Sequence, residues 1–114
     1  MPLIHEFGII NDITEKSYES YAPEKYQCIS VDDAIIQNLM KSLSVMKTYF
    51  ITLNRPAYGL AYHGSTIIPP ESLTTFLDIV LSTDAWKQYD DINNLGEKII
   101  QAKNENKYMI HYGI

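Results

Sequence analysis

The stretch that most constrains the fold runs from Tyr58 to Leu81, where an apolar run meets two consecutive prolines and is followed by an amphipathic segment. Proline donates no backbone hydrogen bond to a sheet, and its fixed φ angle suits the first turn of a helix. Glu71 adds a negative charge where the helix dipole favours one. The stretch therefore predicts a strand that ends at Ile68 and a helix that begins at Pro70.

Both ends of the chain are also predicted to be strands. Leu3 to Ile10 and Tyr108 to Ile114 share Ile-His, an aromatic residue, Gly and Ile in that order, and both alternate polar and apolar residues poorly. Poor alternation is typical of strands that are covered on both faces. We expect these two segments to meet in one sheet.

A helical pattern fills residues 31–53, where apolar side chains recur at the spacing of one helix face. Ser30-Val-Asp-Asp33 has the form of a capping box, so the helix is expected to begin near Val31. β-branched residues lower the helix propensity of the second half, which leaves one long helix or two with a break near Ser42 to Ser44. Asn54-Arg-Pro56 ends the pattern, because a residue before proline avoids helical backbone angles.

The second half of the chain completes the predicted fold. Residues 58–62 and 65–68 form either a tight hairpin or one strand with a bulge at Gly64. Ser82-Thr-Asp84 offers an N-cap for a last helix, whose apolar series is Trp86, Tyr89, Ile92, Leu95, Ile99 and Ala102. We expect residues 1–114 to form a single α+β domain, with about three helices on one face of a small mixed or antiparallel sheet.

Composition and charge exclude several classes of protein. No apolar run approaches the roughly 20 residues of a membrane helix, and the first residues lack a basic region followed by an apolar one, which predicts a cytoplasmic protein without a membrane partner. The net charge of −5 disfavours nucleic acid as a partner. The single Cys28 cannot form an intramolecular disulfide, which fits a reducing compartment.

The charge is divided unevenly along the chain. Residues 1–33 carry a net charge of −5, residues 34–70 contain no acid and carry +3, and residues 71–114 carry −3. Such an asymmetry indicates either an interaction surface or an acidic face that is merely solvated.

Residues 12–27, which we call the arm, are polar and acidic and are predicted to run over the surface. Tyrosine combines a large contact area with a hydroxyl group, and acids steer a basic partner. The arm is therefore the predicted partner-binding surface, through Glu15, Tyr18, Glu19, Tyr21, Glu24 and Tyr26. The alternative is that the tyrosines pin the arm to the core, and we expect a mixture of one buried and two exposed rings.

Candidates for chemistry are few. His5, His63 and His111 each lie in or beside a predicted strand, and His5 and His111 become the best candidates for a general base if the terminal strands pair. Neither zinc-site spacing nor a nucleophile or phosphate-loop motif is present, so no catalytic residue, metal or cofactor is predicted. The adjacent acids Asp32-Asp33 and Asp90-Asp91 are read as a helix cap and a solvated helix face.

Four segments, Met46-Lys-Thr-Tyr-Phe50, Leu53-Asn-Arg-Pro56, Tyr58-Gly-Leu-Ala-Tyr62 and Ile67-Ile-Pro-Pro-Glu-Ser-Leu73, resemble a small group of bacterial proteins placed among the immunity proteins of polymorphic or contact-dependent toxin systems. The small, acidic, motif-free chain is also similar to immunity proteins in type. This resemblance implies stoichiometric neutralisation of a toxin, in which an acidic, tyrosine-bearing face covers a basic active site. Two alternatives stay open: a small enzyme with a histidine and tyrosine pocket, and a homodimer formed through a sheet edge or helix stripe.

Overall fold

The computed structural model describes residues 3–82 and 90–114. The strands are β1 (Ile4–Ile10), β2 (Ile29–Asp32), β3 (Lys47–Phe50), β4 (Pro56–Tyr58), β5 (Ser65–Ile68) and β6 (Tyr108–Tyr112). The helices are α1 (Asp33–Leu43), α2 (Leu73–Ser82) and α3 (Asp90–Glu105), with single 3-10 turns η1 (Pro23–Tyr26) and η2 (Pro70–Ser72).

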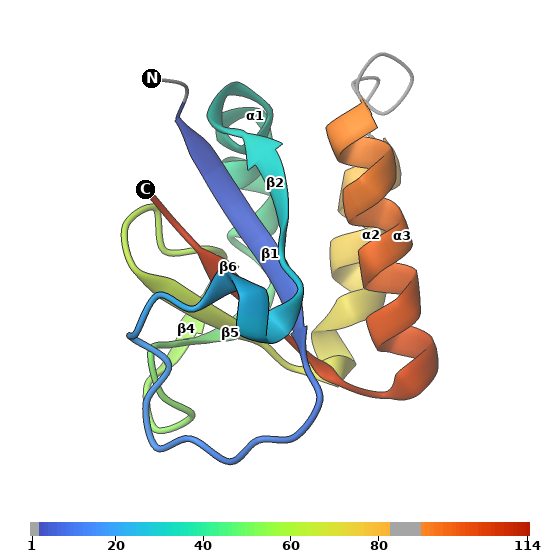
Figure 1. Cartoon of the computed structure of the whole chain (residues 1–114). Coiled ribbons are helices and arrows are strands. Elements are labelled where there is room, and N and C mark those ends of the chain that lie inside the picture. Colours follow the sequence, from blue (N-terminus) through green and yellow to red (C-terminus); the bar gives the residue numbers. More distant parts are fainter. Residues whose placement is uncertain (1–2, 83–89) are drawn as a thin grey trace.

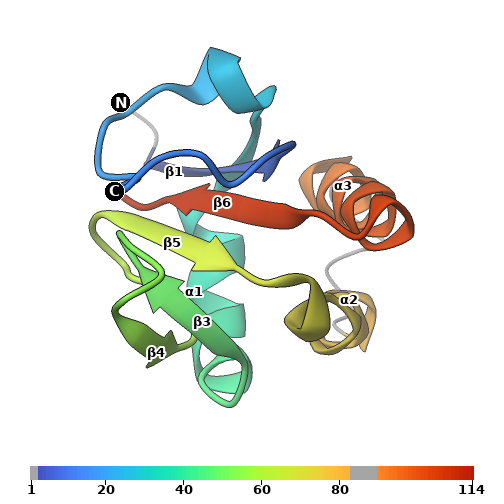
Figure 2. The same cartoon turned by 90° about the horizontal axis from the view of Figure 1, so that it is seen from below.

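All the strand pairings in the described residues are antiparallel, and they place the strands in the order β2-β1-β6-β5-β3-β4 (Figure 2). The last strand, β6, therefore lies between β1 and β5. Phe7 of β1 is opposite His111 of β6, which confirms that the two terminal segments meet in the sheet.

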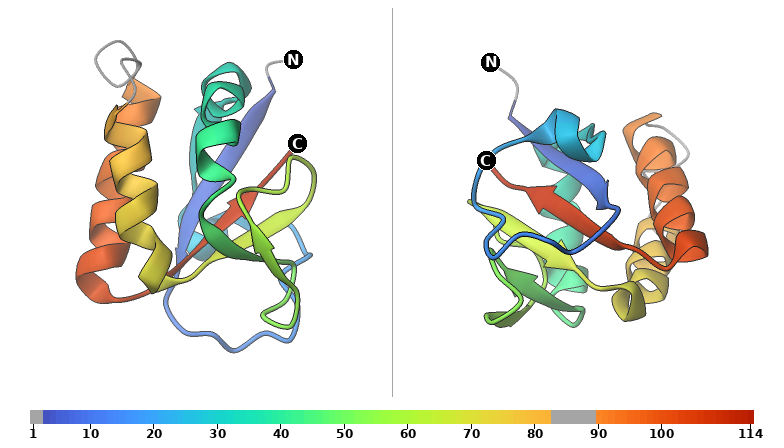
Figure 3. Two further views of the ribbon diagram at one scale, coloured as in Figure 1. Left: turned by 180° about the vertical axis from the view of Figure 1, so that it is seen from behind. Right: turned by 60° about the horizontal axis from the view of Figure 1, so that its bottom comes forward.

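Two separate apolar layers cover the sheet. On one face the three helices pack against strand residues such as Phe7, Ile68 and Met109. On the other face the arm supplies Tyr18 and Tyr26, which pack with residues of β1, β5 and β6. Figure 1 shows the arm passing in front of the sheet, and the left view of Figure 3 shows α1 crossing the opposite face. The predicted α+β class, with helices on one face of a small sheet, is confirmed.

The start of the first helix differs from the prediction. Val31 belongs to β2, where it pairs with His5, and α1 begins at Asp33. The carboxylate of Asp32 accepts a hydrogen bond from the Ala34 amide at 2.8 Å and caps the helix. Val31 is fully buried, so pairing and burial together outweigh the capping-box pattern.

The predicted break near Ser42 to Ser44 is confirmed, but the segment after it is a strand, so both the single-helix and the two-helix predictions are wrong beyond Leu43. In β3 the backbone of Tyr49 is paired with both Pro56 and Ile67 on its two sides. A strand between two neighbours satisfies its backbone groups and suits the β-branched residues that made the helix doubtful.

The two apolar runs after Pro56 form neither a hairpin nor a bulged strand. The first run contributes to β4, which pairs with β3, whereas β5 pairs with the other side of β3 and with β6. Gly59 and Gly64 have φ angles of +72° and +94°, so the connection turns at residues that tolerate a left-handed backbone.

The helices that follow Pro69 agree with the sequence. Pro70 opens η2, which leads directly into α2 with Leu73, Phe76 and Val80 fully buried. In α3 the predicted apolar series is buried at Ile92, Leu95, Ile99 and Ala102. Thr83, Asp84, Trp86 and Tyr89 lie outside the described residues. Within the described part of the chain, no helix combines the length and apolar character needed to cross a membrane.

Candidate functional site

The structure divides the six predicted partner-binding residues into two groups. Tyr18 and Tyr26 are 3 % and 8 % exposed and belong to the apolar layer beneath the arm, whereas Tyr21 is 65 % exposed. The expected mixture of one buried and two exposed rings is therefore wrong, because two rings are buried. Tyr18 and Tyr26 pin the arm, and of the three arm tyrosines only Tyr21 exposes its ring.

Backbone contacts fix the arm as well as its tyrosines do. The Tyr18 amide donates to the Ile51 carbonyl at 2.8 Å, and the Cys28 amide donates to the Pro23 carbonyl at 3.0 Å. Gly8 of β1 lets this segment approach closely, since a Cβ atom there would lie 2.6 Å from the Tyr26 carbonyl oxygen. The arm is thus a fixed loop that lies directly on the sheet.

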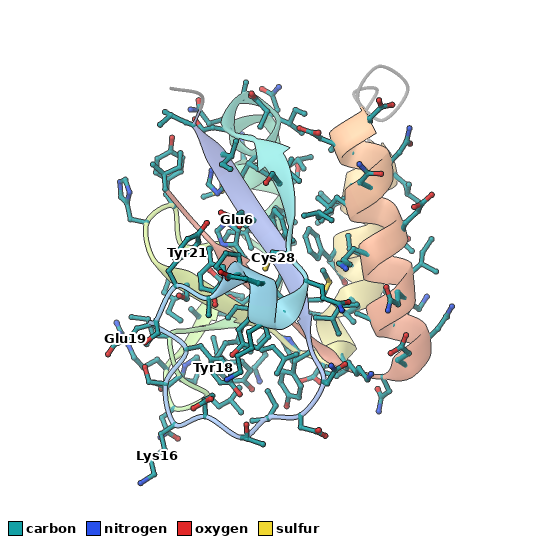
Figure 4. The ribbon with its side chains drawn as sticks, in the orientation of Figure 1. Glu6, Lys16, Tyr18, Glu19, Tyr21 and Cys28 are labelled. Carbon is teal, nitrogen blue, oxygen red and sulfur yellow. The ribbon has the colours of Figure 1, made fainter. Side chains whose placement is uncertain are left out.

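The three predicted glutamates are all exposed, but they are not equivalent. Glu15 forms an ion pair with Lys25 at 2.6 Å, so its charge is already compensated. No ion pair within the described residues involves Glu19 or Glu24. Figure 4 shows Glu19 and Lys16 pointing away from the body of the molecule.

Two strand residues hold the middle of the arm. The Tyr21 hydroxyl donates a hydrogen bond to the Glu6 carboxylate, and this bond, followed by burial, raises the pKa of Tyr21 to about 12. The Tyr112 hydroxyl donates to the Ser20 carbonyl at 3.2 Å and accepts from the Ala22 amide at 3.3 Å. Glu6 and Tyr112 are opposite each other in the β1–β6 ladder, so one strand pair carries both anchors.

A second candidate site lies on the helix face of the same strands. His5 of β1, His111 of β6 and Thr66 of β5 are each 0 % exposed. Nδ1 of His5 lies 2.8 Å from Nε2 of His111, and Nδ1 of His111 lies 3.3 Å from Oγ1 of Thr66. The expectation that pairing of the terminal strands brings His5 and His111 together is confirmed.

Asp33, at the start of α1, supplies the acid. Its Oδ1 lies 2.8 Å from Nε2 of His5, and its Oδ2 accepts from the Gln37 amide at 2.6 Å and the Tyr62 hydroxyl at 2.9 Å. We call His5, His111, Asp33, Thr66, Tyr62 and Gln37 the histidine network. Tyr62 is partly exposed and Gln37 is exposed, so the network reaches solvent at its Asp33 end.

Hydrogen-bond directions assign the proton positions in this network. The Ala61 amide donates to Oγ1 of Thr66 at 2.9 Å, and the Thr66 hydroxyl can then donate to His111. His111 donates from Nε2 to His5, which donates from Nε2 to an ionised Asp33. Both histidines are then neutral, and no buried side-chain nitrogen or oxygen among the described residues lacks a partner.

The pKa values agree with this assignment. Burial, and then the nearby His5, lower the pKa of His111 to about 3. Burial alone would raise the pKa of Asp33, but the hydrogen bonds from His5, Tyr62 and Gln37 outweigh it and lower that pKa. With both histidines neutral in this hydrogen-bond pattern, the network holds one negative charge, on Asp33.

An acid, two imidazoles and a hydroxyl in sequence resemble the parts of an acid–base relay, yet the rings of His5 and His111 are closed to solvent. The third histidine lies elsewhere, because His63 is exposed and its Nδ1 is 2.8 Å from the Ile114 carbonyl oxygen. Among residues 3–82 and 90–114, no group of three or more His, Cys, Asp or Glu side chains is arranged to hold a metal ion.

Four members of the network were not predicted from the sequence: Asp33, Thr66, Tyr62 and Gln37. Asp33 was assigned to the cap together with Asp32, although one carboxylate is enough for a cap. The sequence signal for the network was Asp33 itself, an acid not needed for the cap, with Gln37 one helical turn later on the same helix face. Nothing local to Thr66 or Tyr62 marks them, since only the sheet order brings them to His111 and Asp33.

Comparison with known proteins identifies no relative of this chain, so its function has to be inferred from the geometry described above. No family model, no curated protein and no solved structure matches the chain.

Proposed function

We propose that this chain is a protein-binding module that binds a basic partner through the arm. The observation that carries the proposal is the division of the arm tyrosines, in which Tyr18 and Tyr26 anchor the loop and Tyr21 stands 65 % exposed between them. A loop that is fixed before binding loses little conformational entropy when a partner docks. Glu19 and Glu24 are exposed on either side of Tyr21 and provide charge for steering.

The partner class that fits best is a basic toxin domain, with the chain acting as its immunity protein. Support comes from the acidic first third of the chain, with a net charge of −5, and from the resemblance of residues 46–73 to immunity-type bacterial proteins. Inhibition would be stoichiometric, because the arm covers a basic active site and excludes substrate by occupancy. This mechanism requires no catalytic group in the chain, and the proposed setting is the bacterial cytoplasm.

The proposal is tested by capturing the partner and then measuring its affinity. Tagged chain is recovered from gentle lysates of its native bacterium, and proteins bound in near-equal amount are identified. Titration calorimetry of the purified pair then compares the unmodified chain with a Glu19→Lys/Glu24→Lys variant. We expect weaker binding and a smaller dependence on salt for the variant.

A matched control changes two exposed acids elsewhere by the same charge. Asp78 of α2 and Glu97 of α3 are both exposed and lie outside the arm. The Asp78→Lys/Glu97→Lys variant should bind the partner like the unmodified chain. Equal weakening by both variants would mean that net charge, rather than the arm, governs binding, and unchanged binding in the arm variant would remove the arm from the interface.

A small enzyme remains the second candidate, because the hydrogen-bonded pair of His5 and Asp33 is an acid–base unit. Substrate would have to approach from the partly exposed Tyr62. This candidate predicts a bound metabolite, instead of a protein, in the captured material. Sedimentation of the purified chain at several concentrations separately tests the homodimer.

A further inference from the structure

We propose that the histidine network is a proton-controlled latch for the arm: it holds the arm in place at neutral pH and releases it when the second of its two histidines takes up a proton. The latch is a property of the isolated chain, and its consequence for a partner rests on the function proposed above. It would regulate the same surface that we propose binds the partner.

The first step is the position of the network directly behind the arm anchors. His5 and His111 face the helices, and the next residue on each strand, Glu6 and Tyr112, faces the arm because side chains alternate across a sheet. Glu6 holds Tyr21, and Tyr112 holds the backbone on both sides of it. Any separation of the two rings that spreads β1 from β6 therefore displaces both anchors.

The second step is that the closed network can take up one proton without losing a hydrogen bond. A proton on Nδ1 of His5 gives an imidazolium in contact with Asp33 at 2.8 Å. His111 must then donate from Nδ1 to Thr66 and accept at Nε2, and the Thr66 hydroxyl can rotate to allow this. The donor and the acceptor exchange roles in the His5–His111 bond and in the His111–Thr66 bond, but every hydrogen bond is kept.

A second proton cannot be accommodated in the same way. It would place a charge on His111, whose hydrogen-bond partners are His5 and Thr66 and whose closest ring neighbours are His5 and Phe7. Among the described residues, the titratable side chains that contact the pair are Asp33 of α1, bonded to His5, and Tyr62 of the β4–β5 connection, whose ring meets His5 edge-on, so both lie on the His5 side. Two positive rings would be in contact with one carboxylate, in a site closed to solvent.

The third step is a population shift. In an open form, where the rings reach water, His111 titrates at the ordinary value near 6.5, whereas the closed form excludes its proton. Lowering the pH from 7.5 to 5.0 then favours the open form by about thirtyfold for this one histidine. The open state, which is minor at neutral pH, becomes about thirtyfold more populated relative to the closed state in acid.

The experiment measures amide hydrogen exchange on the full chain at pH 7.5 and 5.0, with each rate divided by its intrinsic rate at that pH. The amides of Tyr18 and Ala22 report the arm, because they donate to Ile51 and Tyr112. We expect their protection to fall by about thirtyfold in acid and, at both pH values, to stay well below that of buried α2 amides such as Phe76, since the arm opens without global unfolding.

Two variants isolate the cause. His111→Gln removes the titrating ring and should make protection of the Ala22 amide independent of pH over this range. His63→Gln changes an exposed histidine outside the network and should behave like the unmodified chain. Equal acid sensitivity in His111→Gln would assign the effect to carboxylates such as Glu6 and overturn the latch, as would constant protection in the unmodified chain.

If His111→Gln does not fold, a nuclear magnetic resonance titration of the unmodified chain decides the question. The Ala22 amide shift must then follow the same midpoint as the ring protons of His111. A midpoint shared with the Glu6 carboxyl carbon would overturn the latch. Because no partner is present, a working latch with no binding in acid or at neutral pH refutes only the proposed function, and binding without a pH response of the arm refutes only the latch.

Discussion

Nδ1 of His5 lies 2.8 Å from Nε2 of His111, although 106 positions separate the two residues along the chain. The contact joins the first and last strands of the sheet and, through Asp33, the start of α1. Its polar atoms form a single satisfied chain, so losing one member leaves others unpaired. Buried networks of this kind are stabilising when they are complete and costly when they are broken.

Replacing Thr66 with valine tests that dependence. The substitution keeps the branched shape but removes the hydroxyl between the Ala61 amide and His111, so two polar groups lose their partner. We expect the free energy of unfolding to fall by about 2 kcal/mol in urea titrations at pH 7. Thr74→Val, at an exposed position of α2, should change it by less than about 0.5 kcal/mol. Similar values for the two variants would argue against the network.

Stability should decrease in mild acid. Because burial lowers the pKa of His111 to about 3, the unfolded chain binds more protons than the folded chain between that value and about 6.5. The free energy of unfolding should therefore drop by about 2 kcal/mol between pH 7 and pH 5 from this residue alone. Carboxyl groups with a lowered pKa, such as Asp33, reduce the free energy of unfolding further only below about pH 4.

Urea titrations at the two pH values measure this loss. His63→Gln should retain it, because that side chain is exposed and outside the network. A folded His111→Gln variant should lose most of it. An unfolding free energy that stays constant from pH 7 to pH 5 in the unmodified chain would contradict the burial of a neutral His111.

The two kinds of arm tyrosine should respond differently to truncation. Tyr18→Ala removes a ring that is 3 % exposed and should cost about 3 kcal/mol of unfolding free energy. Tyr21→Ala removes an exposed ring and a surface hydrogen bond and should cost less than about 1 kcal/mol. Thermal and urea unfolding of both variants checks the ranking. A large loss from Tyr21→Ala would show that this ring supports the fold and would count against its proposed role in binding.

Two glycines offer a second matched pair. A Cβ atom on Gly8 would lie 2.6 Å from the Tyr26 carbonyl oxygen and 2.7 Å from Sγ of Cys28, so Gly8→Ala should cost about 1–3 kcal/mol and lift the arm. Gly96 lies inside α3, and a Cβ atom there would meet Leu81 at an ordinary 3.8 Å. Gly96→Ala should therefore raise the unfolding free energy by about 0.5–1 kcal/mol. Melting curves that shift in the same direction for both would refute this packing.

Much of the fold follows from local chemistry. Pro69 and Pro70 end β5 and begin the next helix as predicted, and the shared pattern of the end segments places His5 beside His111. The helical prediction failed after Leu43 because Met46 and Phe50 continue a helix-like spacing. That segment instead forms β3 because it pairs with β4 and β5, and the local sequence does not indicate this pairing.

In the candidate sites, too, some features follow from local sequence and others depend on residues distant in the chain. The exposed glutamates of the arm were predictable, since acidic side chains stay in water unless a partner brings them inside. The close approach of Tyr26 to the sheet depends on Gly8, a residue of another element that leaves room for it. Asp33 seemed redundant beside Asp32 because its partner, His5, is a distant strand residue.

The central place of β6 has a consequence for how the sheet forms. β6 is the last strand in sequence order, yet it separates β1 from β5 in the sheet. Until residues 108–112 have joined the sheet, β1 and β5 have one open side each, and Thr66 lacks its histidine. Because this strand joins the two halves of the sheet, the halves are expected to form together in one cooperative step whose contacts are distant in sequence.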